Sequence, residues 1–175
     1  FLFTQNYNSR IVGNQPFLFD KIEINKTNSS YQLTIENDTI YVFDSLIVNK
    51  GNIYLNNNVI KLDSTGSLYN ENETNRVFDK GIGYIEAIRN LNSVARYQNI
   101  AGLGVTITTD APHLPGHTII QRSHFPQAGG EITIDSSICR AFVIEPLDDN
   151  NNLNASLEFN YFDAEKRGLL EDSLF

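Results

Sequence analysis

Short apolar segments alternate with short polar segments along the first 75 or so residues. Within several of these segments hydrophobic and polar residues alternate, as in residues 21–25 (Lys-Ile-Glu-Ile-Asn) and 59–63 (Val-Ile-Lys-Leu-Asp). This period of two is typical of a β-strand that buries one face. The pattern predicts strands at residues 17–24, 31–35, 39–48, 52–55 and 59–62.

Clusters of Asn, Asp, Gly and Ser separate these predicted strands. Such residues favour turns, because they tolerate left-handed backbone angles and Asx side chains form local hydrogen bonds. Short strands joined by Asn-rich corners are typical of a β-solenoid, whose rungs stack on one another. Asn side chains at equivalent corners are then expected to form amide ladders. A meandering antiparallel sheet would give nearly the same pattern, so residues 1–76 are predicted to be a β-solenoid-like or meander region.

From about Gly81 onward the predicted strands lengthen, and Gly and Pro mark the turns. No window of about 11 residues keeps the 3.6-residue apolar period of a helix, so the chain is predicted to be all-β. Residues 77–175 fit an antiparallel β-sandwich, and the polar stretch 70–80 is expected to mark the domain boundary. Its strands are predicted at residues 83–89, 100–108, 117–122, 131–134, 138–144 and 156–162, with a last, truncated strand starting near Ser173.

The composition narrows the class of partner. A net charge of −8 and a pI near 4.8 argue against binding to nucleic acid or to an anionic membrane surface. No apolar run approaches the ~20 residues of a membrane span, so no membrane insertion is expected. The sequence begins on Phe-Leu-Phe rather than on Met, and we expect it to be a piece of a larger protein.

Several segments occur in a characteristic order, which is more specific than any one of them. They are residues 51–58 (Gly-Asn-Ile-Tyr-Leu-Asn-Asn-Asn), 60–68 (Ile-Lys-Leu-Asp-Ser-Thr-Gly-Ser-Leu), 73–77 (Glu-Thr-Asn-Arg-Val), 83–91 (Gly-Tyr-Ile-Glu-Ala-Ile-Arg-Asn-Leu), 99–107 (Asn-Ile-Ala-Gly-Leu-Gly-Val-Thr-Ile) and 157–165 (Leu-Glu-Phe-Asn-Tyr-Phe-Asp-Ala-Glu). In this order, over roughly residues 45–175, the chain resembles a module of large, repeat-rich, adhesin-like surface proteins of Bacteroidetes. The resemblance implies a cargo of the type IX secretion apparatus that is displayed at the bacterial cell surface. It carries over no catalytic residues.

Candidate reactive residues are few. His113, His117 and His124 form the only candidate reactive cluster, but Leu-Pro-Gly between the first two excludes the helix that would aim both rings at one metal ion. We therefore expect ordinary loop histidines. The corresponding segment of the resembling module is plainer, so this chain departs from the module here. Cys139 stands alone in an apolar, strand-like stretch and is predicted to be a small buried core residue.

Two features of the sequence suggest ligand binding, one to Ca²⁺ and one to sugars. Asp148, Asp149 and Asn150 offer oxygen ligands of the kind that Ca²⁺ prefers, although their spacing lacks the pattern of a recognised calcium loop and also fits a solvated turn. Tyrosines next to Asn residues on predicted strands are suited to stacking on sugars and hydrogen bonding to them, but they also fit half-buried packing between rungs. These ligand candidates are Tyr31, Tyr41, Tyr54 and Tyr69.

Taken together, the pattern favours a non-catalytic extracellular structural or adhesive module, such as a spacer, stalk or fibre segment. No enzyme is expected, because the sequence shows no converging reactive cluster. Its partners would be other surface-protein modules, or copies of itself joined by β-strand addition. The alternative is a carbohydrate-binding module, with glycans as ligands and Ca²⁺ as a candidate cofactor.

Overall fold

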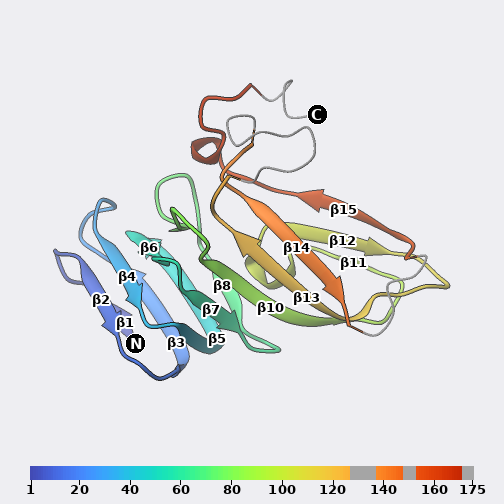
Figure 1. Ribbon diagram of the computed structural model, residues 1–175, viewed down its shortest axis with the longest axis horizontal. Coiled ribbons are helices and arrows are strands. Elements are labelled where there is room, and N and C mark those ends of the chain that lie inside the picture. Colours follow the sequence, from blue (N-terminus) through green and yellow to red (C-terminus); the bar gives the residue numbers. More distant parts are fainter. Residues whose placement is uncertain (127–136, 148–152, 171–175) are drawn as a thin grey trace.

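The computed structural model describes residues 1–126, 137–147 and 153–170, and in this part the chain is all-β (Figure 1). In these described residues two short 3-10 turns, η1 (Ile100–Gly102) and η3 (Asp163–Glu165), accompany the strands. The strands form three sheets. The large sheet holds β1 (Leu2–Phe3), β3 (Phe17–Asn25), β5 (Thr39–Lys50), β7 (Val59–Leu62), β8 (Ser67–Tyr69), β10 (Tyr84–Leu91), β13 (Gly116–Ser123) and β14 (Ala141–Pro146). The second sheet holds β2 (Ser9–Val12), β4 (Gln32–Glu36), β6 (Asn52–Tyr54) and β9 (Val77–Phe78), and the third holds β11 (Arg96–Tyr97), β12 (Val105–Thr109) and β15 (Ala155–Phe159).

The N-terminal strands stack in parallel, as in a β-solenoid. In the second sheet Ser9 pairs with Leu33, Leu33 with Ile53, and Ile53 with Val77. The large sheet has the same arrangement, because β1, β3, β5, β7 and β10 also pair in parallel in this order. The solenoid-like prediction is therefore confirmed, and the meander alternative is wrong for this part.

The core lies between these two parallel sheets. Ile40, Ile60 and Ile85 are in register on neighbouring strands of the large sheet and are fully buried. Leu33 and Ile53 occupy equivalent buried positions in the second sheet. Because β-branched and γ-branched side chains of similar size recur on each rung, each turn of the chain covers the apolar surface of the turn before it.

Asn side chains tie the corners of neighbouring rungs together. Asn58 Nδ2 donates to the carbonyl of Ile35 at 2.8 Å, and Asn52 Nδ2 donates to that of Ser29 at 2.8 Å. In the described residues two amides of neighbouring rungs pair directly at one corner, where Asn70 Nδ2 donates to Asn49 Oδ1 at 2.6 Å, and this single pair is shorter than the expected ladder. Elsewhere the amides mostly satisfy backbone groups one rung away, which the open corner leaves without a sheet partner.

One of these amides supports a stability prediction. Asn75 Oδ1 accepts a hydrogen bond at 2.8 Å from the buried backbone N–H of Gly51, one rung earlier. Asn75→Ala leaves that donor without its partner, and we expect the free energy of unfolding to fall by about 1–3 kcal/mol. Urea unfolding followed by circular dichroism measures the change. The exposed Asn92 provides the control, since Asn92→Ala should stay within about 0.5 kcal/mol of wild type.

The pairing changes direction at β10. This strand is parallel to β7 on one edge and antiparallel to β13 on the other, and β14 then continues the large sheet in antiparallel pairing. The third sheet is antiparallel throughout. Since β9 and β10 still pair with the stacked rungs, both kinds of pairing meet in residues 77–91. The predicted division into residues 1–76 and 77–175 remains a prediction.

Most predicted strands are present with small shifts in their ends, and residues 59–62 match β7 in full. The expected strand at 100–108 is partly wrong, because residues 100–102 form η1 and β12 starts only at Val105. Asn99 and Gly102, with φ angles of 43° and 73°, reverse the chain here. The strands predicted at 131–134 and near Ser173 lie outside the described residues. Very short strands such as β1, β9 and β11 were not predicted, since two residues carry no readable period.

Candidate functional site

The sequence-predicted tyrosines lie on different surfaces. Tyr41 projects from the outer face of the large sheet, whereas Tyr54 lies on the second sheet and stacks on Phe78, with ring centroids 5.1 Å apart. Tyr69 lies on β8, and Tyr31 precedes β4. The structure therefore does not bring these four side chains together, and their role as ligand contacts remains a prediction.

A groove of about 490 Å³ surrounds Tyr41 on the large sheet. Tyr41, Lys61 and Glu86 are in register on neighbouring strands and line it together. Lys61 Nζ lies 2.7 Å from Glu86 Oε1, and Gln121 Nε2 donates to Glu86 Oε2 at 2.8 Å. The hydrogen bond with Glu86 raises the pKa of Lys61 despite partial burial. The groove thus offers one aromatic ring beside a fixed row of polar groups.

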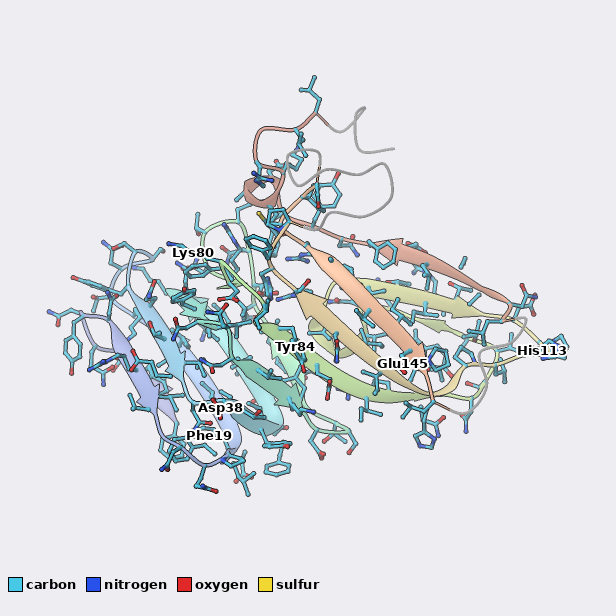
Figure 2. All side chains as sticks on the ribbon, in the orientation of Figure 1. Phe19, Asp38, Lys80, Tyr84, His113 and Glu145 are labelled. Carbon is cyan, nitrogen blue, oxygen red and sulfur yellow. The ribbon has the colours of Figure 1, made fainter. Side chains whose placement is uncertain are left out.

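The three histidines are not arranged as a metal site. His113 is exposed on the loop at the far end of the antiparallel part, away from Tyr84 in the middle of the large sheet (Figure 2). His117 is exposed on β13 and lines the groove, whereas His124 is buried. Among the described residues, no group of three or more His, Cys, Asp or Glu side chains could hold a metal ion. The calcium candidates Asp148, Asp149 and Asn150 lie outside the described residues.

His124 is buried among positive charges. Burial, followed by the charges of Arg122, Arg140 and Arg76, holds the pKa of His124 well below its usual range. Within the described part of the chain, neither ring nitrogen of His124 has a hydrogen-bond partner. The ring is therefore neutral in the folded protein at neutral pH.

This burial predicts acid sensitivity. Above about pH 6.5 His124 is neutral in both the folded and the unfolded chain, so it contributes no pH dependence. As pH falls below that value the unfolded chain takes up a proton and the folded chain does not, so stability falls by about 1.4 kcal/mol per pH unit. Urea unfolding at several pH values between 4.5 and 6.5 should show this slope, and His124→Gln should reduce it. A His113→Gln variant that changed the slope as much would contradict this assignment.

A second hollow, which we call the joint cavity, lies where the stacked rungs meet the antiparallel strands. It has a volume of about 420 Å³. Its walls come from the corner after β8, from the segment between β11 and β12, and from residues 158–162 after and within β15. The buried Arg122 and Arg140 also line it. Three segments and two single arginines, from five separate parts of the sequence, therefore build this cavity.

Arg122 is inserted into the joint from the inner face of β13. Its side chain is fully buried and holds both carboxylate oxygens of Glu71, with Nη1–Oε2 and Nη2–Oε1 distances of 2.8 and 2.9 Å. Glu71 Oε1 also accepts the N–H of Val77 at 2.8 Å. This two-point contact fixes a rung corner against an antiparallel strand.

Arg140 forms a second buried ion pair in the same region. Its Nη2 donates to Glu165 Oε1 at 2.9 Å, and its Nη1 donates to the carbonyl of Asn160 at 2.7 Å. The guanidinium carbon lies 4.8 Å from the ring centroid of Phe162. Burial lowers the pKa of Arg140, although Glu165 offsets part of this effect. These contacts hold the C-terminal segment in place over the joint.

Cys139 corrects a prediction. It is only half-buried and precedes β14 rather than lying in a strand of the core. Its backbone N–H donates to the carbonyl of Glu165 at 2.8 Å, because the chain turns here to meet the C-terminal segment. Burial raises the pKa of the Cys139 thiol, so the less reactive protonated form is favoured at neutral pH.

Sequence reasoning missed the joint cavity. The strand that carries Arg122 contains two consecutive isoleucines, Ile119 and Ile120, so the alternation around it does not show which face of the strand is buried. Glu71 lies in the polar stretch 70–80, which the sequence predicts to be a domain boundary. The nearest available signal is a single Arg in each of the predicted strands 117–122 and 138–144, since an Arg that a strand buries needs a buried partner.

Chemically, the joint cavity combines guanidinium and amide donors with carboxylate and amide acceptors. Arg96 and Glu158 form a further ion pair on its exposed side, with an Nη2–Oε2 distance of 2.9 Å. In the part of the chain that the structure describes, no helix has the length and apolar character to cross a membrane. In comparisons with known proteins, no family model matched the chain, and no match was found among curated proteins or among solved structures.

Proposed function

We propose that the chain is a non-catalytic, extracellular structural module that acts as a spacer, stalk or fibre segment. The parent would be a large, repeat-rich, adhesin-like surface protein of Bacteroidetes. The observation that carries the proposal is the parallel stacking of rungs on two sheets. Each rung adds one strand to each sheet, so such an architecture extends in one direction without changing its cross-section.

The antiparallel strands complete the proposed architecture as a β-sandwich. Val105 and Ile107 of β12 and Ile120 of β13 belong to one buried core. Phe142 of β14 stacks on Phe159 of β15, with ring centroids 5.0 Å apart, which joins the large sheet to the third. These contacts support two facing antiparallel layers at the end of the stacked rungs.

Strand addition is the proposed route to partners, which are other surface modules or copies of this chain. Among the described residues β1 pairs only with β3, and β2 only with β4. Phe1, Leu2 and Val12 near these edges are exposed apolar side chains. An edge that no described strand covers offers backbone groups to a further strand.

Association of the purified protein tests this route. We expect sedimentation equilibrium to show reversible self-association that Val12→Lys weakens, because a charge on an edge strand opposes pairing. Val94→Lys is the matched control, since Val12 and Val94 are 59% and 58% exposed. A wild-type protein that stays monomeric over the whole concentration range would rule out self-association as the assembly mode.

Cell-surface location and lack of catalysis need separate tests. Antibodies against the module should label intact cells that carry the parent protein, without permeabilisation. A panel of glycans and peptides should remain uncleaved in its presence. Labelling only after permeabilisation would overturn the proposed location, and turnover abolished by one carboxylate or His substitution would overturn the structural role.

Carbohydrate binding is the second candidate function. The groove around Tyr41 favours it, because an aromatic ring beside fixed polar groups is a common way to hold a sugar. A glycan array probed with and without chelator tests the candidate and its proposed dependence on Ca²⁺. Absence of binding in both conditions would remove it.

A further inference from the structure

We infer that the joint cavity, rather than the tyrosine-bearing strands, binds a neutral sugar residue of a glycan. This inference rests on the second candidate function, carbohydrate binding, and gives it a site and a ligand class. The volume of about 420 Å³ is within the range of small-ligand sites and leaves room for one or two sugar rings.

The lining suits hydroxyl groups in particular. A sugar hydroxyl both donates and accepts, so it is best satisfied where donors and acceptors lie side by side. Gln98 and Asn70 contribute amides that do both, while Arg96 donates and Glu158 accepts at the exposed side. An apolar ligand would cover these polar groups without offering them any hydrogen bond.

The charges of the site are balanced in pairs. Arg122 contacts Glu71, Arg140 contacts Glu165, and Arg96 contacts Glu158, each at 2.8–2.9 Å. An acidic ligand would therefore gain little net attraction from the arginines and would meet carboxylates beside them. A neutral polyhydroxylated ligand avoids this conflict, and it is the class to which the pairing points.

The walls are also fixed before any ligand arrives. Asn99 Oδ1 accepts the N–H of Gly104 at 2.8 Å within a turn whose Asn99, Ala101 and Gly102 all have positive φ angles. Arg140 holds Phe162 in place beside Tyr161, which supplies aromatic surface for the apolar face of a sugar ring. A rigid polar site loses less entropy on binding than a flexible one.

The test begins with a glycan array and continues by calorimetry with the neutral sugar that binds best and with glucuronic acid. Gln98→Ala and Arg96→Ala should each weaken binding of the neutral sugar by about tenfold, the loss of roughly one hydrogen bond. Arg10→Ala is the matched control, because Arg10 also forms an exposed ion pair, with Glu36, far from the cavity. Glu158→Gln should improve binding of glucuronic acid, since it leaves Arg96 unbalanced.

The outcomes separate the inference from the function on which it rests. Loss of affinity in the cavity variants, with Tyr41→Ala and Arg10→Ala unchanged, supports the cavity. Loss in Tyr41→Ala alone places carbohydrate binding in the groove and overturns the inference. Stronger binding of glucuronic acid than of neutral sugars by the wild type overturns the proposed ligand class. Absence of binding to any glycan overturns both the inference and the second candidate function, but leaves the structural role standing.

Discussion

Replacing Arg122 by Ala is expected to lower the free energy of unfolding by about 3–5 kcal/mol. The substitution leaves the Glu71 carboxylate, whose side chain is 7% exposed, without its two-point guanidinium partner. A buried carboxylate without a charged partner has lost its hydration, and the one remaining hydrogen bond from the N–H of Val77 does not offset that loss. Urea unfolding at pH 7, followed by circular dichroism, measures the effect.

Two variants distinguish this buried pair from ordinary packing. Arg122→Met combined with Glu71→Gln removes both charges while keeping an acceptor for the N–H of Val77, and it should recover most of the lost stability. Arg10→Ala breaks an exposed ion pair and should cost at most about 1 kcal/mol. A double variant no more stable than Arg122→Ala would show that the charge was not the cause.

Gly102→Ala is expected to cost about 2–5 kcal/mol. Gly102 has a φ of +73°, a backbone region that costs a residue with a side chain about 1–2 kcal/mol. A Cβ built there would also lie 1.9 Å from the carbonyl oxygen of Leu68, so the turn must move away from β8 at a further cost of about 1–3 kcal/mol. Chemical unfolding measures the total loss of stability. The displaced turn should also lower the affinity of the joint cavity for any ligand that it binds.

Gly168 separates the two contributions. Its φ of +83° is similar, but among the described residues, its two chain neighbours aside, a Cβ there meets no atom within 4 Å. Gly168→Ala should therefore cost only the backbone part, about 1–2 kcal/mol. Equal losses in the two variants would mean that the contact with Leu68 contributes nothing.

The strands of this fold could be predicted from the sequence more readily than their pairing. Alternation in residues 59–62 identifies β7 in full, because it reports which face of one strand is buried. Pairing depends on how far apart equivalent residues lie, and this distance varies. Leu33 pairs with a residue 24 positions before it and with one 20 positions after it, so no fixed repeat length shows in the sequence.

The joint cavity was harder to predict because each of its charged residues has an ordinary local context. Glu71 lies in a polar stretch and Arg122 lies in a strand, and 51 residues separate them. Only the three-dimensional return of β13 alongside β10 brings Arg122 to the corner that carries Glu71. Local periodicity contains no information about such a return. The tyrosines were more visible in the sequence, but the fold distributes them over several surfaces.

In the proposed role as a spacer or stalk, the change of pairing at β10 has a mechanical consequence. Tension along the stack passes through each strand pair in turn, and β10 is joined to β7 over four residue pairs but to β13 over eight. In the second sheet only two residue pairs join β9 to β6. The seam before β9 and β10 should therefore yield before the antiparallel strands separate. The Arg122–Glu71 ion pair crosses this seam and would resist its opening. This one ion pair would therefore raise the force needed to separate the two sides of the seam.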